Sequence, residues 1–143
     1  MTFSSKLAAQ VMAVAKKPIT ATSFAGDDIR YAAEYEVLEQ ELAKAASLHA
    51  AGTVDWEAVR EGSESLLSTQ TKDLRIAAWL TWGLYQRDSF LGLHAGLAML
   101  GFLCRDHWED MHPRKDRTRT AAISWLVPRM EQVLADHVPM GEQ

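Results

Sequence analysis

The sequence contains almost no cysteine and no long apolar run. Cys104 is the one cysteine among 143 residues, which excludes an internal disulfide and favours a reducing compartment. The longest apolar run, Leu91–Leu103, spans about thirteen residues and includes His94, whereas a membrane-spanning helix needs roughly twenty. Met1–Lys17 has no long apolar core, so it does not resemble a secretory signal. We therefore expect a cytoplasmic protein without a membrane span.

The sequence also lacks a basic excess and a cofactor or metal motif. Its net charge is −4, which argues against a protein dedicated to nucleic acid. No glycine-rich phosphate loop follows a strand pattern. His107 and His112 are five residues apart, so they do not share a helix face, and the HExxH pattern is absent. We expect no cofactor, no metal ion and no nucleic-acid partner.

Strand patterns are missing as well, because no segment alternates apolar and polar residues with a period of two. Apolar residues recur instead at three- and four-residue steps. We predict an all-α fold, with about six helices packed as successive antiparallel hairpins around a central apolar hairpin, residues 71–113. The length suits a single domain.

The central hairpin is predicted from two apolar helices that are interrupted at Gln86–Asp88. Asp88 or Ser89 is expected to cap the second helix. The spacing Gly92-x-x-x-Gly96 would allow another helix to approach closely. The apolar stripes consist of Leu74, Ala77, Ala78, Thr81, Leu84 and Tyr85 in the first helix, and Phe90, Leu93, Leu97, Leu100 and Cys104 in the second.

The other expected helices cover residues 4–16, 29–51 and 55–69, with one from about Thr118. For 29–51 we predict a cap at Asp27 or Asp28, Tyr31 on the inward stripe and a stop at Gly52. Asp55 should cap the helix 55–69, where Gly62 is a weak point unless another helix approaches it closely. Pro128 either kinks the last helix or starts a new one. We assign residues 1–28 to an N-terminal helix and connector, 29–138 to the domain, and 139–143 to a frayed end.

Several blocks of the sequence resemble one known family. Lys72–Thr81 (KDLRIAAWLT), the Gly/Leu-rich helix that follows it, and Trp108–Pro113 (WEDMHP) are similar to the N-terminal domain of the TssA (ImpA-like) family of type VI secretion proteins. Gly26–Tyr31, Asp55–Leu67 and Arg119–Leu126 also resemble family segments. The connector Thr20–Ala25 departs from the family, which often has a proline and a cysteine there.

The resemblance implies a protein-interaction domain with no enzymatic activity. Family members associate with the baseplate, tail tube and sheath of the secretion system, and prime or cap sheath growth; TagA-like and VasL-like members share the domain. The full-length proteins continue into further domains, the last of which forms rings, so this chain would be an N-terminal part of a homo-oligomer. The family signature is expected to be mostly structural and comprises Lys72, Asp73, Leu74, Arg75, Trp79, Trp108, His112 and Pro113.

A candidate partner surface lies in the basic loop after the hairpin and in two tryptophans outside the apolar stripes. Its members are Arg114, Lys115, Arg117, Arg119, Trp82 and Trp125. The alternative is a solvated loop whose charges offset Glu109 and Asp110. Residues 27–61 contain nine acidic and three basic residues, so the molecule is expected to be electrically two-sided, which favours oriented docking.

Two other functions stay open on the sequence. Cys104 and His107 are three residues apart on one helix and could form the thiolate pair of a small enzyme. Against this, Cys104 continues an apolar stripe, which predicts burial as a small hydrophobic residue. The basic loop could instead bind a phosphate backbone.

Overall fold

The computed structural model describes residues 5–46 and 53–137, and all regular structure in them is helical. The elements are α1 (Lys6–Lys16), α2 (Ala33–Ala43), the short 3-10 helix η1 (Lys44–Ala46), α3 (Trp56–Thr69), α4 (Leu74–Asp106) and α5 (Asp116–His137). The all-α prediction is confirmed. The count is five α-helices, not about six, because both helices of the predicted hairpin belong to α4.

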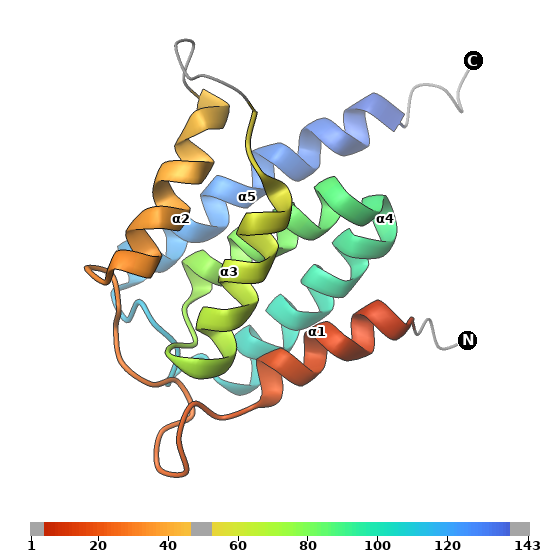
Figure 1. The fold of residues 1–143 in the computed structure, drawn as a ribbon. Coiled ribbons are helices and arrows are strands. Elements are labelled where there is room, and N and C mark those ends of the chain that lie inside the picture. Colours follow the sequence, from red (N-terminus) through yellow and green to blue (C-terminus); the bar gives the residue numbers. More distant parts are fainter. Residues whose placement is uncertain (1–4, 47–52, 138–143) are drawn as a thin grey trace.

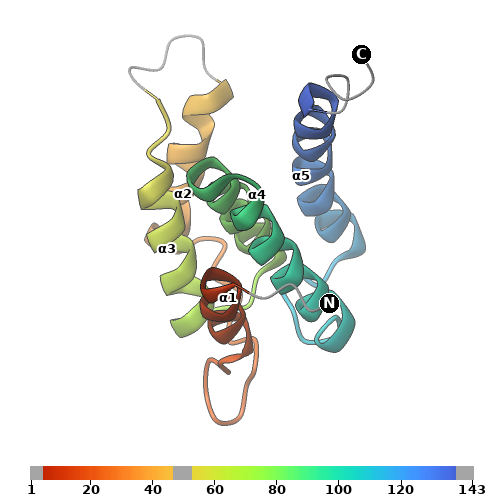
Figure 2. The same cartoon turned by 90° about the vertical axis from the view of Figure 1, so that its right-hand side faces the viewer.

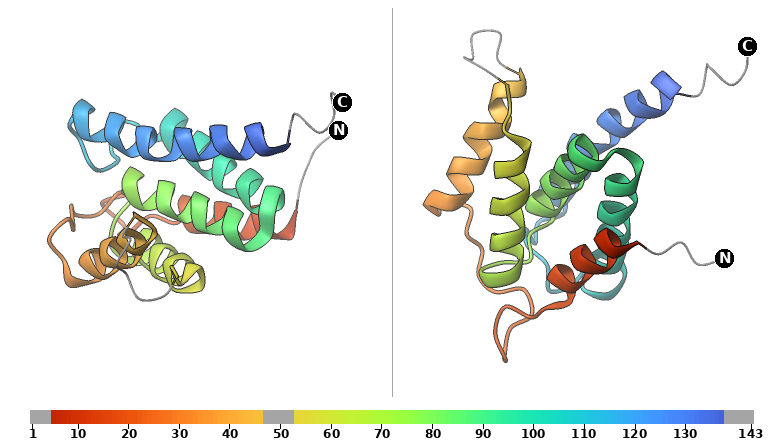
Figure 3. Two further views of the ribbon diagram at one scale, coloured as in Figure 1. Left: turned by 90° about the horizontal axis from the view of Figure 1, so that it is seen from above. Right: turned by 45° about the vertical axis from the view of Figure 1, so that its right-hand side comes forward.

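Helix α4 is the centre of the molecule and folds back on itself as a hairpin (Figure 1). The reversal occurs at Ser89, whose φ of 55° is uncommon for a residue other than glycine. Helices α1 and α3 pack on α4, α2 packs on the outer side of α3, and α5 packs on α4 from the opposite direction. Figure 2 shows α4 between the α2–α3 pair and α5, and Figure 3 shows the same layers from above.

Two glycines let the arms of α4 touch. A Cβ added at Gly92 would lie 2.0 Å from the carbonyl oxygen of Leu84, and one at Gly96 would lie 2.6 Å from Thr81. The second arm thus crosses the first backbone to backbone, as expected from the Gly92-x-x-x-Gly96 spacing. Burial of Leu74, Ala77, Ala78, Leu80, Leu84, Ala95, Met99 and Leu103 makes this hairpin the main part of the core.

Helices α1 and α3 both begin with a side-chain cap, and that of α3 is the predicted one. The side chain of Ser5 accepts a hydrogen bond from the Ala8 amide, and that of Asp55 accepts one from the Ala58 amide. Gly62 is the site of close approach, because an added Cβ would lie 2.8 Å from Cδ2 of Leu38 on α2. The residues that predict these two helix starts are close together in the sequence, and both helices begin there in the structure.

The prediction for the helix at 29–51 is wrong at its start. Asp28 does not cap a helix there; it accepts a hydrogen bond from the Arg30 amide in a turn, and α2 begins only at Ala33. Tyr31 therefore precedes the helix and is 89% exposed, not part of an inward stripe. The predicted continuation over 47–51, the stop at Gly52 and the frayed end 139–143 lie outside the described residues.

Helix α5 settles the two alternatives for Pro128. It runs unbroken from Asp116 to His137 with Pro128 inside it, so no new helix starts there. The proline lies on the exposed side of α5. Its missing N–H costs one helical bond on the side that water can reach.

We predict that Gly92→Ala lowers the free energy of unfolding by about 3 kcal/mol, because the new methyl group overlaps the Leu84 backbone. Gly101 is the matched control: a Cβ there meets nothing within 4 Å. Gly101→Ala should raise stability by up to about 1 kcal/mol through helix propensity. Urea unfolding measures both. Equal effects of the two changes would contradict the close crossing of the α4 arms.

Candidate functional site

A buried junction, which we define as residues 25–26, 71–74 and 111–113, contains five of the eight signature residues: Lys72, Asp73, Leu74, His112 and Pro113. Here three chain segments pair through their backbones just before α4 begins and after it ends. The Lys72 amide donates to Ala25 O at 2.8 Å, the His112 amide to Lys72 O at 2.9 Å, and the Leu74 amide to His112 O at 2.7 Å. The junction therefore ties both ends of the hairpin to the connector after α1.

Lys72 is the unusual member of the junction because it is fully buried and no carboxylate among the described residues pairs with it. Its Nζ donates to the carbonyl oxygens of Val14 and Leu67, at 2.8 and 2.5 Å, and lies 5.4 Å from the centre of the Phe24 ring. Burial lowers the pKa of Lys72 to about 8, and the positive charge of Lys17 acts in the same direction. Lys72 thus joins the ends of α1 and α3.

Asp73 and Arg75 begin α4 as a paired cap. Asp73 is fully buried; its carboxylate accepts from the Arg75 amide at 2.8 Å and from the Arg75 guanidinium at 3.0 and 2.6 Å. The guanidinium also lies 3.5 Å from Asp28 and 5.1 Å from the centre of the Tyr35 ring. Arg75 is therefore a positioned cation at the edge of the junction.

His112 and Pro113 close the junction from the other end of α4. Nε2 of His112 donates to Gly26 O at 2.8 Å, so this nitrogen carries a proton. The His112–Pro113 peptide bond is cis. Gly26 has a φ of 68°, and a Cβ there would lie 2.3 Å from Gln70 O, so the position requires glycine.

Arg119 is not part of an exposed surface, and its prediction as a partner residue is wrong. It is 5% exposed and donates to Pro113 O and Met111 O, at 2.6 and 2.7 Å. Its guanidinium lies 4.3 Å from the centre of the Trp108 ring, which is itself 40% exposed. The basic loop thus gives one arginine to the fold, and Arg114, Lys115 and Arg117 remain exposed.

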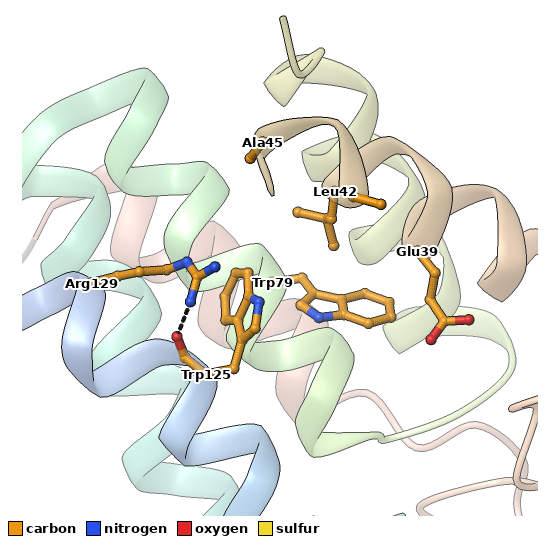
Figure 4. A pocket seen from close by; sticks show the side chains of 7 residues that line it. Glu39, Leu42, Ala45, Trp79, Trp125 and Arg129 are labelled. Carbon is orange, nitrogen blue, oxygen red and sulfur yellow. Dashed lines mark hydrogen bonds between the residues drawn. The ribbon is translucent and has the colours of Figure 1, made fainter. Parts of the chain in front are cut away.

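The two tryptophans proposed for the partner surface lie in different places. Trp82 is half-buried on the first arm of α4, where it stacks on Tyr85 with 5.1 Å between ring centres. Trp125 is half-buried on α5 beside Trp79 of α4, and Arg129 stacks on it at 4.1 Å and donates to its carbonyl oxygen (Figure 4). The fold therefore separates the predicted set.

Trp79 and Trp125 lie in a surface hollow that the sequence does not reveal. Helices α2 and α5 do not pack against each other in the described part of the chain. A hollow lies between them, lined by residues of both helices and by Trp79 of α4. Its upper part has a volume of about 530 Å³. We call it the α2–α5 trough; it is lined by Tyr35, Glu39, Leu42, Ala43, Ala45, Arg75, Trp79, Thr118, Ala121, Ala122, Trp125 and Arg129.

The lower end of the trough opens into a cationic hollow of about 450 Å³. It shares Arg75 and Thr118 with the trough and adds Arg30, Tyr31, Arg114 and Lys115, with Asp28, His112 and Pro113. Two members of the predicted surface, Arg114 and Lys115, are therefore brought next to the signature residues. Neither Arg30 nor Tyr31 was predicted for the surface. Tyr31 was assigned to the inward stripe of the helix predicted at 29–51.

In the described residues no hydrogen bond joins Cys104 to His107, the pair considered for a thiolate. His107 stacks on Phe24, with ring centres 3.6 Å apart, and its Nδ1 lies 3.3 Å from Asp110. Burial raises the pKa of the Cys104 thiol, which opposes a reactive thiolate. No group of three or more potential metal ligands occurs in the described segments, and no helix there is long and apolar enough to cross a membrane.

Comparison with known proteins identifies the family. The family model described as ImpA, N-terminal, type VI secretion system, matches residues 16–128. The chain belongs to this family. The match includes the whole junction and most of the trough. No curated protein matches the chain.

A solved structure supports the ImpA N-terminal assignment. It is the N-terminal domain, including the conserved ImpA_N region, of the TssA component of the type VI secretion system from Burkholderia cenocepacia. The sequences are 33% identical, the TM-score is 0.74, and the match covers 86% of this chain and 49% of that chain. This chain thus corresponds to about half of the solved one.

We predict that the buried Lys72 makes stability rise with pH. Lys72 is charged in both states below pH 8; above it, the folded state loses the proton while the unfolded state, with a pKa of 10.5, keeps it. The unfolding free energy should therefore rise by about 2 kcal/mol between pH 7 and 9.5, relative to Lys72→Met.

The comparison with the variant is needed because other groups act in the opposite direction. Burial raises the pKa of Tyr35 to about 12 and also raises that of Cys104, so both lower stability at high pH. Both groups are unchanged in Lys72→Met and cancel in the difference. Lys6→Met, which removes an exposed lysine, is the control: its unfolding free energy should rise between pH 7 and 9.5 as in the wild type. If the unfolding free energy of the wild type and of Lys72→Met changed equally with pH, Lys72 would not be a buried group with a lowered pKa.

We also predict that Cys104 in the native protein reacts with a thiol reagent at pH 8 about tenfold more slowly than in the urea-unfolded chain, because it is half-buried with a raised pKa. Absorbance of the released chromophore measures both rates. A native rate above the unfolded rate would show an activated thiolate and restore the thiol-enzyme alternative.

Proposed function

We propose that this chain is a non-catalytic protein-interaction domain of a type VI secretion assembly protein. On this proposal it acts in the cytoplasm, at the baseplate and at the tail tube and sheath, where the protein primes or caps sheath growth. The observation that carries the proposal is the match of residues 16–128 to the ImpA N-terminal family, together with the fold shared with a TssA component.

The side-chain chemistry supports binding and not catalysis. Lys72 and Asp73 of the junction, and Arg119 beside it, use their buried polar groups in hydrogen bonds to the backbone. The exposed cations and the trough lie around this rigid frame. A rigid frame that presents polar and aromatic side chains is a common arrangement for docking a partner.

The proposal extends to the assembly of the full-length protein. The solved TssA structure is about twice as long as the matched region, so this chain corresponds to only part of its relative. We propose that ring formation depends on a C-terminal domain beyond this region, and that the present domain projects from the ring to recruit a component.

The test is a binding titration of the purified 143-residue chain against separately purified baseplate, tube and sheath proteins of the same secretion system. We expect saturable binding to one of them and none to an unrelated helical protein of similar net charge. Biolayer interferometry measures both. Failure to bind any component would overturn the recruiting role and leave a spacer.

A further inference from the structure

The α2–α5 trough and the cationic hollow adjoin each other on the surface, and we call the two together the channel. The upper and middle parts share Trp79 and Trp125, and the middle and lower parts share Arg75 and Thr118. From Thr118 to Arg129 the wall formed by α5 is about 16 Å long, because a helix rises 1.5 Å per residue. This length matches about three turns of a bound helix.

The channel is chemically asymmetric along its length. Its middle is mostly apolar and aromatic, and its upper part contains one carboxylate, Glu39, and one cation, Arg129. The cationic hollow at its lower end contains Arg30, Arg114 and Lys115. Within the described residues these three cations make no ion pair. The carboxylate that lines the hollow, Asp28, lies 3.5 Å from the Arg75 guanidinium and is already paired. The lower end therefore has unneutralised positive charge.

The walls of the channel favour a helical occupant over an extended one. Both walls are helices whose interior backbone groups are already hydrogen-bonded, and the described segments contain no strand edge that could pair with an extended peptide. A helix satisfies its own backbone and presents apolar side chains every three or four residues. Such side chains could lie against Trp79 and Trp125.

We propose that the channel binds an amphipathic helical segment of a partner secretion protein, with apolar residues against Trp79 and Trp125 and acidic residues next to Arg114 and Lys115. This proposal rests on the proposed function, because it names the chemistry of the recruited partner. Opposite charges at one end would fix the direction in which the segment lies. The apolar middle would supply most of the affinity.

A second copy of the chain is a poorer occupant. The acidic helices of the described chain are α2 and α3, and their apolar residues, Tyr35 and Leu38 of α2 and Val59, Leu66 and Leu67 of α3, are buried in the same molecule. To enter the channel of another copy, α2 would have to leave its own core. The same cost applies to α3. A separate partner segment has no such cost.

The test uses two channel variants with matched controls. Arg114→Glu with Lys115→Glu reverses the cationic end, and Lys6→Glu with Arg105→Glu makes the same charge change at exposed residues outside the channel. Ala121→Trp fills the apolar middle, and Thr120→Trp adds the same side chain at an exposed neighbour. Circular dichroism and thermal unfolding verify that each variant is folded.

We expect both channel variants to weaken binding to the component found in the titration by about tenfold or more, and both controls to bind within about twofold of the wild type. If the wild type binds and the channel variants bind equally well, the channel is overturned while the proposed function stands. The channel proposal would also be overturned if light scattering showed that a second copy of the chain binds and the component does not.

If no intact component binds, the proposed function fails and a separate measurement decides the channel. Overlapping peptides of about eighteen residues, covering the same components, are titrated by fluorescence anisotropy. Binding of an acidic amphipathic peptide that the channel variants weaken would support the channel. No binding by any peptide would overturn it.

Discussion

The buried ammonium group of Lys72 is the constraint on which the arrangement of the helices depends. It is fully buried, and its hydrogen bonds go to carbonyl groups at the ends of two helices, Val14 of α1 and Leu67 of α3. The carbonyls at helix C-termini carry partial negative charge and lack partners within the helix, so they stabilise a cation without a carboxylate. One side chain thus sets where α1 and α3 end relative to the start of α4.

The neighbouring backbone extends this constraint to the rest of the chain. His112 pairs with Lys72 and Leu74, so the end of the α4 hairpin is held beside its beginning. Arg119 then bonds the carbonyl groups of Met111 and Pro113, which determines where α5 leaves the junction. Because α5 starts there and crosses α4 away from α2, the space between α2 and α5 is a consequence of the junction.

The central hairpin and the Asp55 cap could be predicted because each depends on residues close in sequence. Gly62 indicated only that a helix could approach there, because its partner Leu38 belongs to another helix. The prediction for Tyr31 was wrong because Asp28 bonds the nearby Arg30 amide in a turn, a local alternative to capping a helix. Arg119 was misassigned because its partners are carbonyl groups that only the turn at Met111–Pro113 exposes to it. The trough depends on three elements far apart in sequence, so no single pattern indicates it.

Some charged residues of this chain are buried and others are exposed. This difference determines whether a resemblance to the family at a given position says something about the fold or about the partner. The charged residues of the signature, Lys72, Asp73 and Arg75, are committed to the junction, so a resemblance at these positions supports the fold. The cations that remain available to a partner, Arg30, Arg114 and Lys115, make few contacts within the chain and can change without damage to it. Related domains could therefore keep one fold and still recognise different segments, because these three cations lie outside the junction even though Arg75, His112 and Pro113 line the same hollow.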